Sequence, residues 1–187
     1  MSFRPRRPAS AIAFAALATS ALVMPVAAVN QVTQTINGGT RTASIADLTL
    51  SAVNYSHSAQ SNTGTMVLTA DDSSGSGVGW NVTVQSSAFV YSGANGGTNI
   101  PAGNFSIATA GAPTRTAGQS VDVVGGPSVP LVGSTGSLDV ARKTMSALLG
   151  FGQGTYTQNL GVSLSIPALS RAGTYTGTMT VTISAGP

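Results

Sequence analysis

Apolar and polar residues alternate with a period of two along most of the chain. In segment 174–183 threonine occupies every even position. The odd positions hold Tyr175, Gly177, Met179, Val181 and Ile183. Successive side chains of a strand point to opposite faces of a sheet, so this segment predicts a half-buried strand with a threonine outer face. The same alternation predicts strands over 160–166, 80–85 and 66–70, and a weaker strand over 32–36.

Two segments depart from this regularity. In 45–55 the apolar residues change from even positions, at Leu48 and Leu50, to odd positions, at Val53 and Tyr55. That change predicts a strand with a bulge or bend near residues 51–52. Segment 141–149 has the chain's helix-like apolar spacing, and we interpret it as a strand end or a short helix.

Stretches rich in glycine, proline and serine separate the predicted strands, at 72–79, 92–99, 111–118 and 125–136. Short strands with such turns are typical of antiparallel sandwiches and barrels. We therefore predict an all-β fold: an antiparallel β-sandwich of the immunoglobulin-like or Greek-key type. Little or no helix is expected outside the N-terminal segment.

The N-terminus has the features of a signal peptide. Three arginines, at positions 4, 6 and 7, precede an apolar run over 11–23, and small residues lead up to Ala28. This order predicts a signal peptide over 1–28 with cleavage after Ala28. The run is short for a membrane span. The remaining chain is predicted to comprise an N-terminal strand or linker, 29–44, and one β-domain, 45–187.

The charge of the exported chain differs from that of the whole sequence. The formal net charge is +3, and the three arginines of the predicted signal peptide account for it. After cleavage, Arg41, Arg115, Arg142, Lys143 and Arg171 balance Asp47, Asp71, Asp72, Asp122 and Asp139. A chain without excess positive charge lacks the electrostatic signature of nucleic-acid binding. We expect no nucleic-acid partner and no transmembrane segment in the mature chain.

The chain contains few of the side chains that commonly take part in catalysis. The chain has no Cys, a single His and 7% charged residues, and its acids are all aspartates. A serine triad would need His57, which lies in a polar, turn-like stretch without a G-x-S-x-G motif. A glycosidase needs two suitably separated carboxylates, and no motif marks such a pair. We expect a non-catalytic protein without a cofactor, and retain a wall hydrolase as a lesser alternative.

Three further features each allow a structural and a functional interpretation. Asp71-Asp72 is a weak candidate for calcium, although such a pair more often starts a turn. The glycine motifs at 75–79 and 150–154 resemble phosphate loops, but neither opens a predicted helix, which favours plain turns. Trp80, the single tryptophan, is either a core anchor or an exposed stacking residue at the start of a strand.

Two segments together resemble the WxL domain, a surface module of Gram-positive bacteria. The first, 68–84, has an acidic turn, a glycine stretch and Trp80-Asn81-Val82 in place of the first W-x-L motif. The second, 150–187, has a G-x-G loop, a strand ending in L-S-I-P, an A-G-T-Y turn and a last strand. That last strand carries Val181-Thr182-Ile183 in place of the second W-x-L, without its tryptophan.

The resemblance implies a secreted β-sandwich that associates non-covalently with the cell wall, through peptidoglycan or through neighbouring surface proteins. It implies wall or partner contacts by the residues of the two motifs: Trp80, Asn81, Val82, Val181, Thr182 and Ile183. The missing second tryptophan removes an aromatic surface that could stack on a glycan. The ligand and the oligomeric state stay open at this point.

The chain ends are compatible with attachment by surface contacts, because 184–187 contains no sorting motif and no lipidation cysteine follows Ala28. An alternative is a structural subunit of a surface polymer, similar to a pilin or a spore-coat component. In that case 29–36 would be an exchangeable strand that pairs with the sheet edge of a neighbouring copy.

Overall fold

The computed structural model describes residues 31–187, and its folded domain comprises residues 36–187. The predicted signal peptide lies outside the described residues. In this part of the chain, no helix combines the length and apolar character that crossing a membrane would require.

The domain consists of eleven strands and one short 3₁₀ turn, η1 (Ala102–Asn104). The strands are β1 (Arg41–Ile45), β2 (Gln60–Asp72), β3 (Trp80–Ser86), β4 (Val90–Ser92), β5 (Phe105–Ala110), β6 (Thr114–Gly118), β7 (Gly136–Ser137), β8 (Arg142–Ala147), β9 (Gly154–Ile166), β10 (Thr174–Thr176) and β11 (Met179–Ala185).

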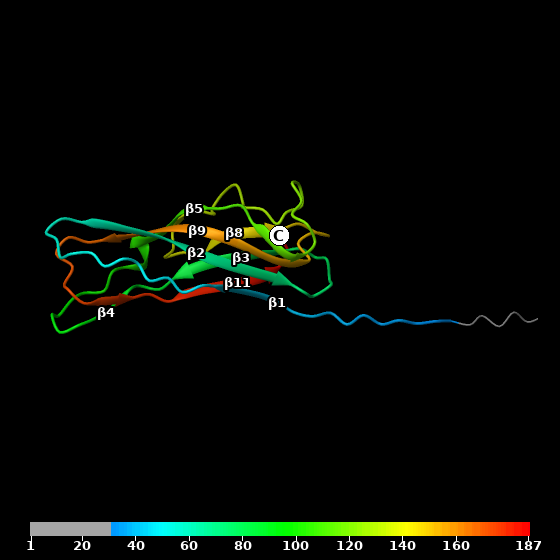
Figure 1. Ribbon diagram of the computed structural model, residues 1–187, viewed down its shortest axis with the longest axis horizontal. Helices are drawn as coiled ribbons and strands as arrows, with labels where there is room; N and C mark the ends of the chain where they lie inside the picture. Colours follow the sequence, from blue (N-terminus) through cyan, green and yellow to red (C-terminus); the bar gives the residue numbers. More distant parts are fainter. Residues whose placement is uncertain (1–30) are drawn as a thin grey trace, which may run out of the picture. The chain divides into compact units, whose positions relative to one another are not determined.

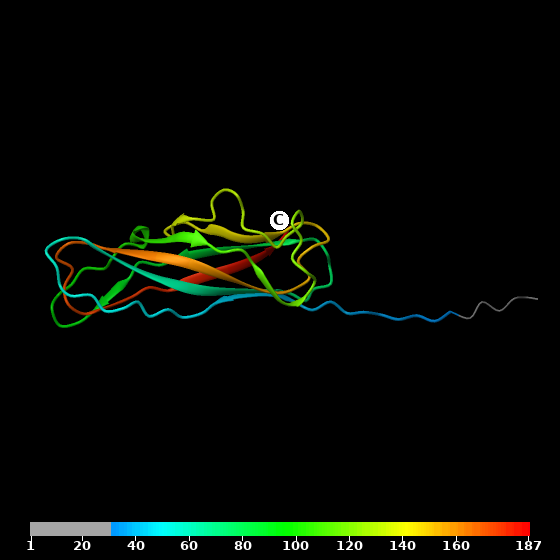
Figure 2. The same ribbon diagram turned by 45° about the horizontal axis from the view of Figure 1, so that its top comes forward.

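These strands form an antiparallel β-sandwich, which confirms the predicted fold class (Figure 1). The larger sheet has the order β1-β2-β9-β5-β7, with β6 also paired to β9. The smaller sheet has the order β11-β3-β8, and β10 and β4 form a separate two-stranded ladder. Figure 2 shows the same layers after rotation, with the yellow-green loops between β6 and β8 projecting from the top.

The long antiparallel ladder between β2 and β9 supplies much of the core. The two strands pair from Gln60 opposite Ile166 to Asp71 opposite Thr155. Because alternate residues face the same side, the apolar positions of both strands point inward and are buried. The buried apolar residues of this pair are Met66, Leu68, Ala70, Tyr156, Leu160, Val162 and Leu164. Burial of each large side chain stabilises the fold by about 1.5–3 kcal/mol.

The smaller sheet follows the predicted alternation. Trp80, Val82 and Val84 of β3 are buried, and the threonines of β11 at 180 and 182 are exposed, as the period of two predicted. The predicted strand over 174–183 is interrupted, however, between β10 and β11. A Cβ at Gly177 would lie 3.1 Å from the ring of Phe89, which shows how closely the backbone approaches that ring at the interruption.

Two strand predictions were wrong. Residues 32–36 form no strand, and pairing with β2 begins only at Arg41. Residues 46–56, called the strap below, form no strand either. The chain leaves β2 after the Ala46 amide donates to the Val67 carbonyl at 2.9 Å. Leu48 and Leu50 then pack over Gly64, where a Cβ would lie 2.8 and 2.9 Å from their methyl groups.

The helix-like segment is strand β8, which agrees with the strand interpretation and excludes the helix. The register against β3 shifts between Val82 and Thr83, so that Thr144 and Met145 are both buried although they are neighbours. A bulge of this kind breaks the period of two, which explains the misleading pattern. The turn-rich stretch 111–118 likewise contains β6, which pairs with β9.

Candidate functional site

The two WxL-like segments lie on adjacent paired strands. β3 and β11 are antiparallel, with Val82 opposite Ile183 and Asn81 opposite Ser184. Segments separated by about a hundred positions in sequence are therefore brought side by side in the smaller sheet. The two motif segments are thus neighbours in the fold.

The inward side of this strand pair is core. Trp80 and Val82 are 0% exposed, while Val181 and Ile183 are half-buried and pack against the core. Neither Trp80 nor Val82 has surface with which to touch a glycan or a partner. Their burial favours the alternative of a core anchor for Trp80.

Trp80 is held by two contacts from the second segment. Its Nε1 donates a hydrogen bond of 2.8 Å to the carbonyl oxygen of Gly152, and its ring lies 6.1 Å from that of Tyr156. The Tyr156 hydroxyl donates to the Gln119 carbonyl at 2.7 Å. Burial raises the pKa of Tyr156, the positive charge of Arg115 lowers it, and the negative charge of Asp72 raises it.

The outward side of the same pair is polar and neutral. Thr182 is exposed, and Asn81 is half-buried with its Nδ2 donating to the Gly186 carbonyl at 2.9 Å. Their neighbours on this face are Thr83, Gln85 and Thr180. Of the six predicted contact residues, Asn81 and Thr182 are therefore the two on the solvent-facing side of the sheet.

The two glycine motifs form turns, as the sequence analysis favoured. Gly75, Gly77 and Gly79 have φ angles of 64°, 67° and 72°. In the other motif, the Gly150 amide donates to the Gly77 carbonyl at 2.7 Å, so the two loops touch. Neither loop opens a helix, and a phosphate loop requires one.

The acidic pair starts a turn, in agreement with its structural interpretation. The Oδ1 atom of Asp72 accepts the Ser74 amide at 3.0 Å, and its Oδ2 lies 3.2 Å from Nε of Arg41. Asp71 accepts hydrogen bonds from the hydroxyls of Ser73 and Thr155, both at 2.6 Å. Both carboxylates thus have structural partners, and residues 31–187 contain no group of three acids or histidines arranged to hold a metal.

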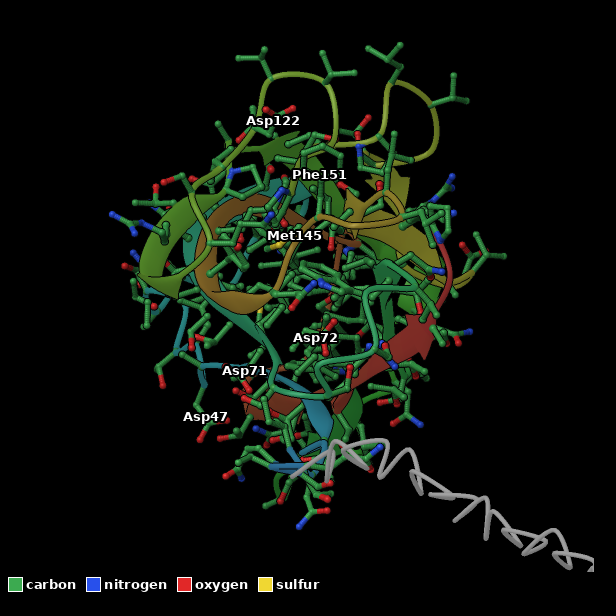
Figure 3. All side chains as sticks on the ribbon, turned by 90° about the vertical axis from the view of Figure 1, so that its right-hand side faces the viewer. Asp47, Asp71, Asp72, Asp122, Met145 and Phe151 are labelled. Atoms are coloured by element: carbon green, nitrogen blue, oxygen red, sulfur yellow. The ribbon has the colours of Figure 1, made fainter. Side chains whose placement is uncertain are left out.

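The remaining candidate groups for catalysis lie apart. Figure 3 shows Asp122 at the top of the domain, whereas Asp47, Asp71 and Asp72 lie in its lower half. Asp122 accepts the amides of Gly125 and Val124 at 2.7 and 2.8 Å, and these bonds lower its pKa. The ring of His57 lies edge-on to Tyr55, at 5.4 Å between centroids.

A groove that the sequence did not predict lies beside the strap. Two adjoining hollows, of about 580 and 540 Å³, lie between the strap and the chain around β10. The floor of the larger hollow is apolar and includes Phe89, Ile100, Leu164 and Ile166. Its rim is polar and includes Asn54, Ser56, Ser170 and Arg171. The A-G-T-Y motif at 172–175 borders this groove and was the one sequence signal that marked it.

A second conspicuous surface is formed by two loops with exposed aliphatic tips. Val123 is 99% exposed, and Val124, Leu131 and Val132 are also almost completely exposed. The first loop is held rigid below its tip, because Asp122 and Gly126 exchange two backbone hydrogen bonds of 3.0 and 2.9 Å. Figure 3 shows this loop rising above Phe151, and a Cβ at Gly125 would overlap the ring of Phe151.

The comparison with protein families agrees with the paired motifs. The model of the family described as "WxL domain surface cell wall-binding" matches residues 28–187. The chain belongs to the WxL family. The match confirms the resemblance inferred from segments 68–84 and 150–187, and it places this WxL protein at the cell surface in association with the wall. No curated protein and no solved structure matches the chain.

Proposed function

We propose that this WxL protein is a secreted, non-catalytic module that attaches to the cell wall or to other surface proteins by non-covalent contacts. The observation that carries the proposal is the family match over 28–187, combined with the two motif segments paired on one sheet. The non-catalytic part draws support from the aspartates, because Asp71, Asp72 and Asp122 are engaged in hydrogen bonds that shape turns.

The proposed order of the chain is a signal peptide over 1–28, a linker or strand segment over 29–44 and the WxL domain over 45–187. β1 lies across the boundary between the last two parts, and its five residues pair with β2 from Arg41 opposite Asp72 to Ile45 opposite Leu68. Cleavage after Ala28 would release the chain without disturbing this ladder. Mass spectrometry of the exported protein tests the cleavage position.

We assign the contact with wall or partner to the outer face around Asn81 and Thr182. The other four motif residues, Trp80, Val82, Val181 and Ile183, support that face from the inside. Neutral amides and hydroxyls on a sheet face suit hydrogen bonding to sugar hydroxyls or to a partner's backbone, because they bind without the cost of removing a charge from water.

A sedimentation assay with purified Gram-positive cell walls tests this function. Residues 29–187 should bind the walls and be released by urea, since no covalent bond is involved. Asn81→Ala combined with Thr182→Ala should weaken binding, whereas Thr65→Ala, an exposed threonine on β2, should not. A chain that stays in the supernatant would refute wall binding. Binding that is unaffected by the double substitution would remove the outer face from the contact.

The alternative, a subunit of a surface polymer, has one observation in its favour. Val32 is 98% and Ile36 is 90% exposed, in a stretch that forms no strand. Alternating apolar residues in such a segment could pair with the edge strand β1 or β11 of another copy. Concentration-dependent polymers that disappear when 29–36 is deleted would support this function, whereas a monomer at all concentrations would exclude it.

A further inference from the structure

We propose that the groove beside the strap binds peptidoglycan at a position where a glycan strand carries an acidic peptide, with Arg171 pairing with a peptide carboxylate. The inference rests on the proposed wall-binding function and names the ligand and a second contact site for it. It concerns the end of the domain where the strap, β4 and β10 lie together (Figure 1).

The size and lining of the groove suit a ligand of several rings. A volume of about 580 Å³ falls within the range of ligand-binding clefts. Phe89 and Ile166 are half-buried and offer apolar surface, to which the less polar faces of sugar rings and peptide methyl groups can bind, above the buried Ile100 and Leu164. The amides and hydroxyls on the rim can hydrogen-bond to sugar hydroxyls and peptide groups. An apolar floor with a few polar groups is the usual composition of a binding cleft.

The charge of the larger hollow favours an anion. Arg171 is the sole charged residue among those that line this hollow, and the one acidic residue beside it, Asp47, lines the adjoining smaller hollow. Its side chain is exposed, and the one ion pair within residues 31–187 is that of Arg41 with Asp72. An unpaired guanidinium matches the planar geometry of a carboxylate and can donate two hydrogen bonds to it. Peptidoglycan combines carboxylates and sugars in one polymer.

The turn that carries Arg171 is held in place before any ligand binds. The Tyr175 hydroxyl donates to the Arg171 carbonyl at 2.9 Å. The Tyr91 hydroxyl and Nδ2 of Asn95 both donate to the Ala172 carbonyl at 2.9 Å. The two tyrosine rings pack at 5.2 Å between centroids. A backbone fixed in this way loses little entropy on binding, which favours affinity.

The same turn explains the glycine of the A-G-T-Y motif. A Cβ at Gly173 would lie 2.9 Å from the Ser92 carbonyl oxygen and would overlap the Tyr91 ring. Glycine is therefore required for the ring to reach the Ala172 carbonyl. The motif thereby fixes the position of Arg171 at the rim of the groove.

The strap supplies a further part of the lining. Tyr55 is 54% exposed and lines the larger hollow, so part of its ring is free to stack on a sugar. The strap is tied to the neighbouring turn by the Leu169 amide, which donates to the Ser56 carbonyl at 3.0 Å. Stacking on the Tyr55 ring and pairing with the Arg171 guanidinium would fix the sugar and the peptide of one fragment.

Titration calorimetry with a soluble disaccharide-tetrapeptide prepared from peptidoglycan tests the site directly. Residues 29–187 should bind this fragment. Arg171→Gln should lower the affinity at least tenfold, and Tyr55→Ala should lower it several-fold. Arg115→Gln removes the same charge from β6 and should leave the affinity unchanged. When the fragment's carboxylates are amidated, the wild-type affinity should fall to that of Arg171→Gln.

The outcomes separate this inference from the proposed function. Arg171 and Tyr55 are exposed, so both variants should fold, and the fluorescence of the buried Trp80 verifies this. Equal fragment affinity in wild type and Arg171→Gln would overturn the groove site, even if the chain still sediments with walls. Self-association that depends on Arg171, without fragment binding, would overturn it in favour of a second copy. Absence of any sedimentation with walls would instead refute the proposed function.

Discussion

The indole nitrogen of Trp80 donates a hydrogen bond of 2.8 Å to the carbonyl oxygen of Gly152, which lies in the loop between β8 and β9. This bond connects the first WxL-like segment to the glycine loop of the second. A Cβ at Gly152 would lie 2.7 Å from the same indole nitrogen. The glycine and the tryptophan therefore depend on each other sterically as well as through the hydrogen bond.

Gly152→Ala should destabilise the domain strongly. The residue has a φ of 78°, which costs about 1–2 kcal/mol for a residue with a Cβ, and the new methyl would overlap Ala147 and Trp80. Gly150→Ala is the matched control, because Gly150 has a φ of 83° but nothing within 4 Å of its Cβ position. Urea unfolding should show a clearly larger loss for Gly152→Ala. Equal losses would show that the loop moves away without cost.

Trp80→Phe should destabilise the fold, and this loss of stability should be the same with and without a ligand. The substitution leaves the Gly152 carbonyl without its donor, at a cost of about 1–3 kcal/mol, and the smaller ring adds a cavity cost. Thermal unfolding measures the loss, and wall binding at a temperature where the variant is folded should match the wild type. Because Trp80 is the single tryptophan and is buried, acrylamide should quench the fluorescence of the native protein poorly. Efficient quenching would contradict the burial of Trp80.

The alternation of residues predicted the fold class and the best strands, because a sheet with one buried face imposes a period of two on the sequence. β3, the inward residues of β9 and the threonine face of β11 follow this rule directly. The strap does not, because Leu48 and Leu50 reach the core from a chain that has left the sheet. β8 does not follow the rule either, because its bulge buries the two neighbouring residues Thr144 and Met145 in the core.

The two motif segments pair in the smaller sheet, but the sequence did not indicate which of their side chains point inward. The family pattern marks Trp80 and Val82, and a sequence alone does not tell a motif that builds the core from one that contacts a ligand. The groove was missed for a different reason. Its lining comes from the strap, from Phe89 and Ile100, and from the turn around Arg171, which become neighbours only through the tertiary fold.

Removing the carboxylate of the Arg41–Asp72 pair should cost about 3 kcal/mol, because Asp72 is buried and Arg41 would lose its counter-charge. Nε of Arg41 and Oδ2 of Asp72 are 3.2 Å apart but have no hydrogen bond of good geometry, so the attraction between them is chiefly that of opposite charges. Asp72→Ala also removes the acceptor for the Ser74 amide. Chemical unfolding of Asp72→Ala, Arg41→Ala and the double variant gives the coupling energy. Additive losses would show that the pair contributes nothing of its own.

Replacing the exposed aliphatic tips should change solubility and not stability. Val123→Ser combined with Val124→Ser should alter the free energy of unfolding by no more than about 0.5 kcal/mol for each substitution, since neither side chain is buried. The variant should elute earlier from a hydrophobic-interaction column. Val82→Ser, which places a hydroxyl in the core, is the buried counterpart and should lose several-fold more stability. A large loss in the tip variant would mean that the loop is packed.

Asp122 should make the stability of the domain depend on pH at the acidic end. Two backbone hydrogen bonds, from Gly125 first and Val124 second, lower its pKa below the ordinary value of 3.8, against a small opposing effect of burial. Because the folded pKa is the lower one, the stabilisation is complete above pH 3.8 and disappears as the pH falls through the folded value. Asp122→Asn should therefore melt below the wild type at pH 6, and the two should converge as the pH falls below 3.8. Parallel melting curves for Asp122→Asn and wild type across the whole range would show that the turn does not depend on the charge of this carboxylate.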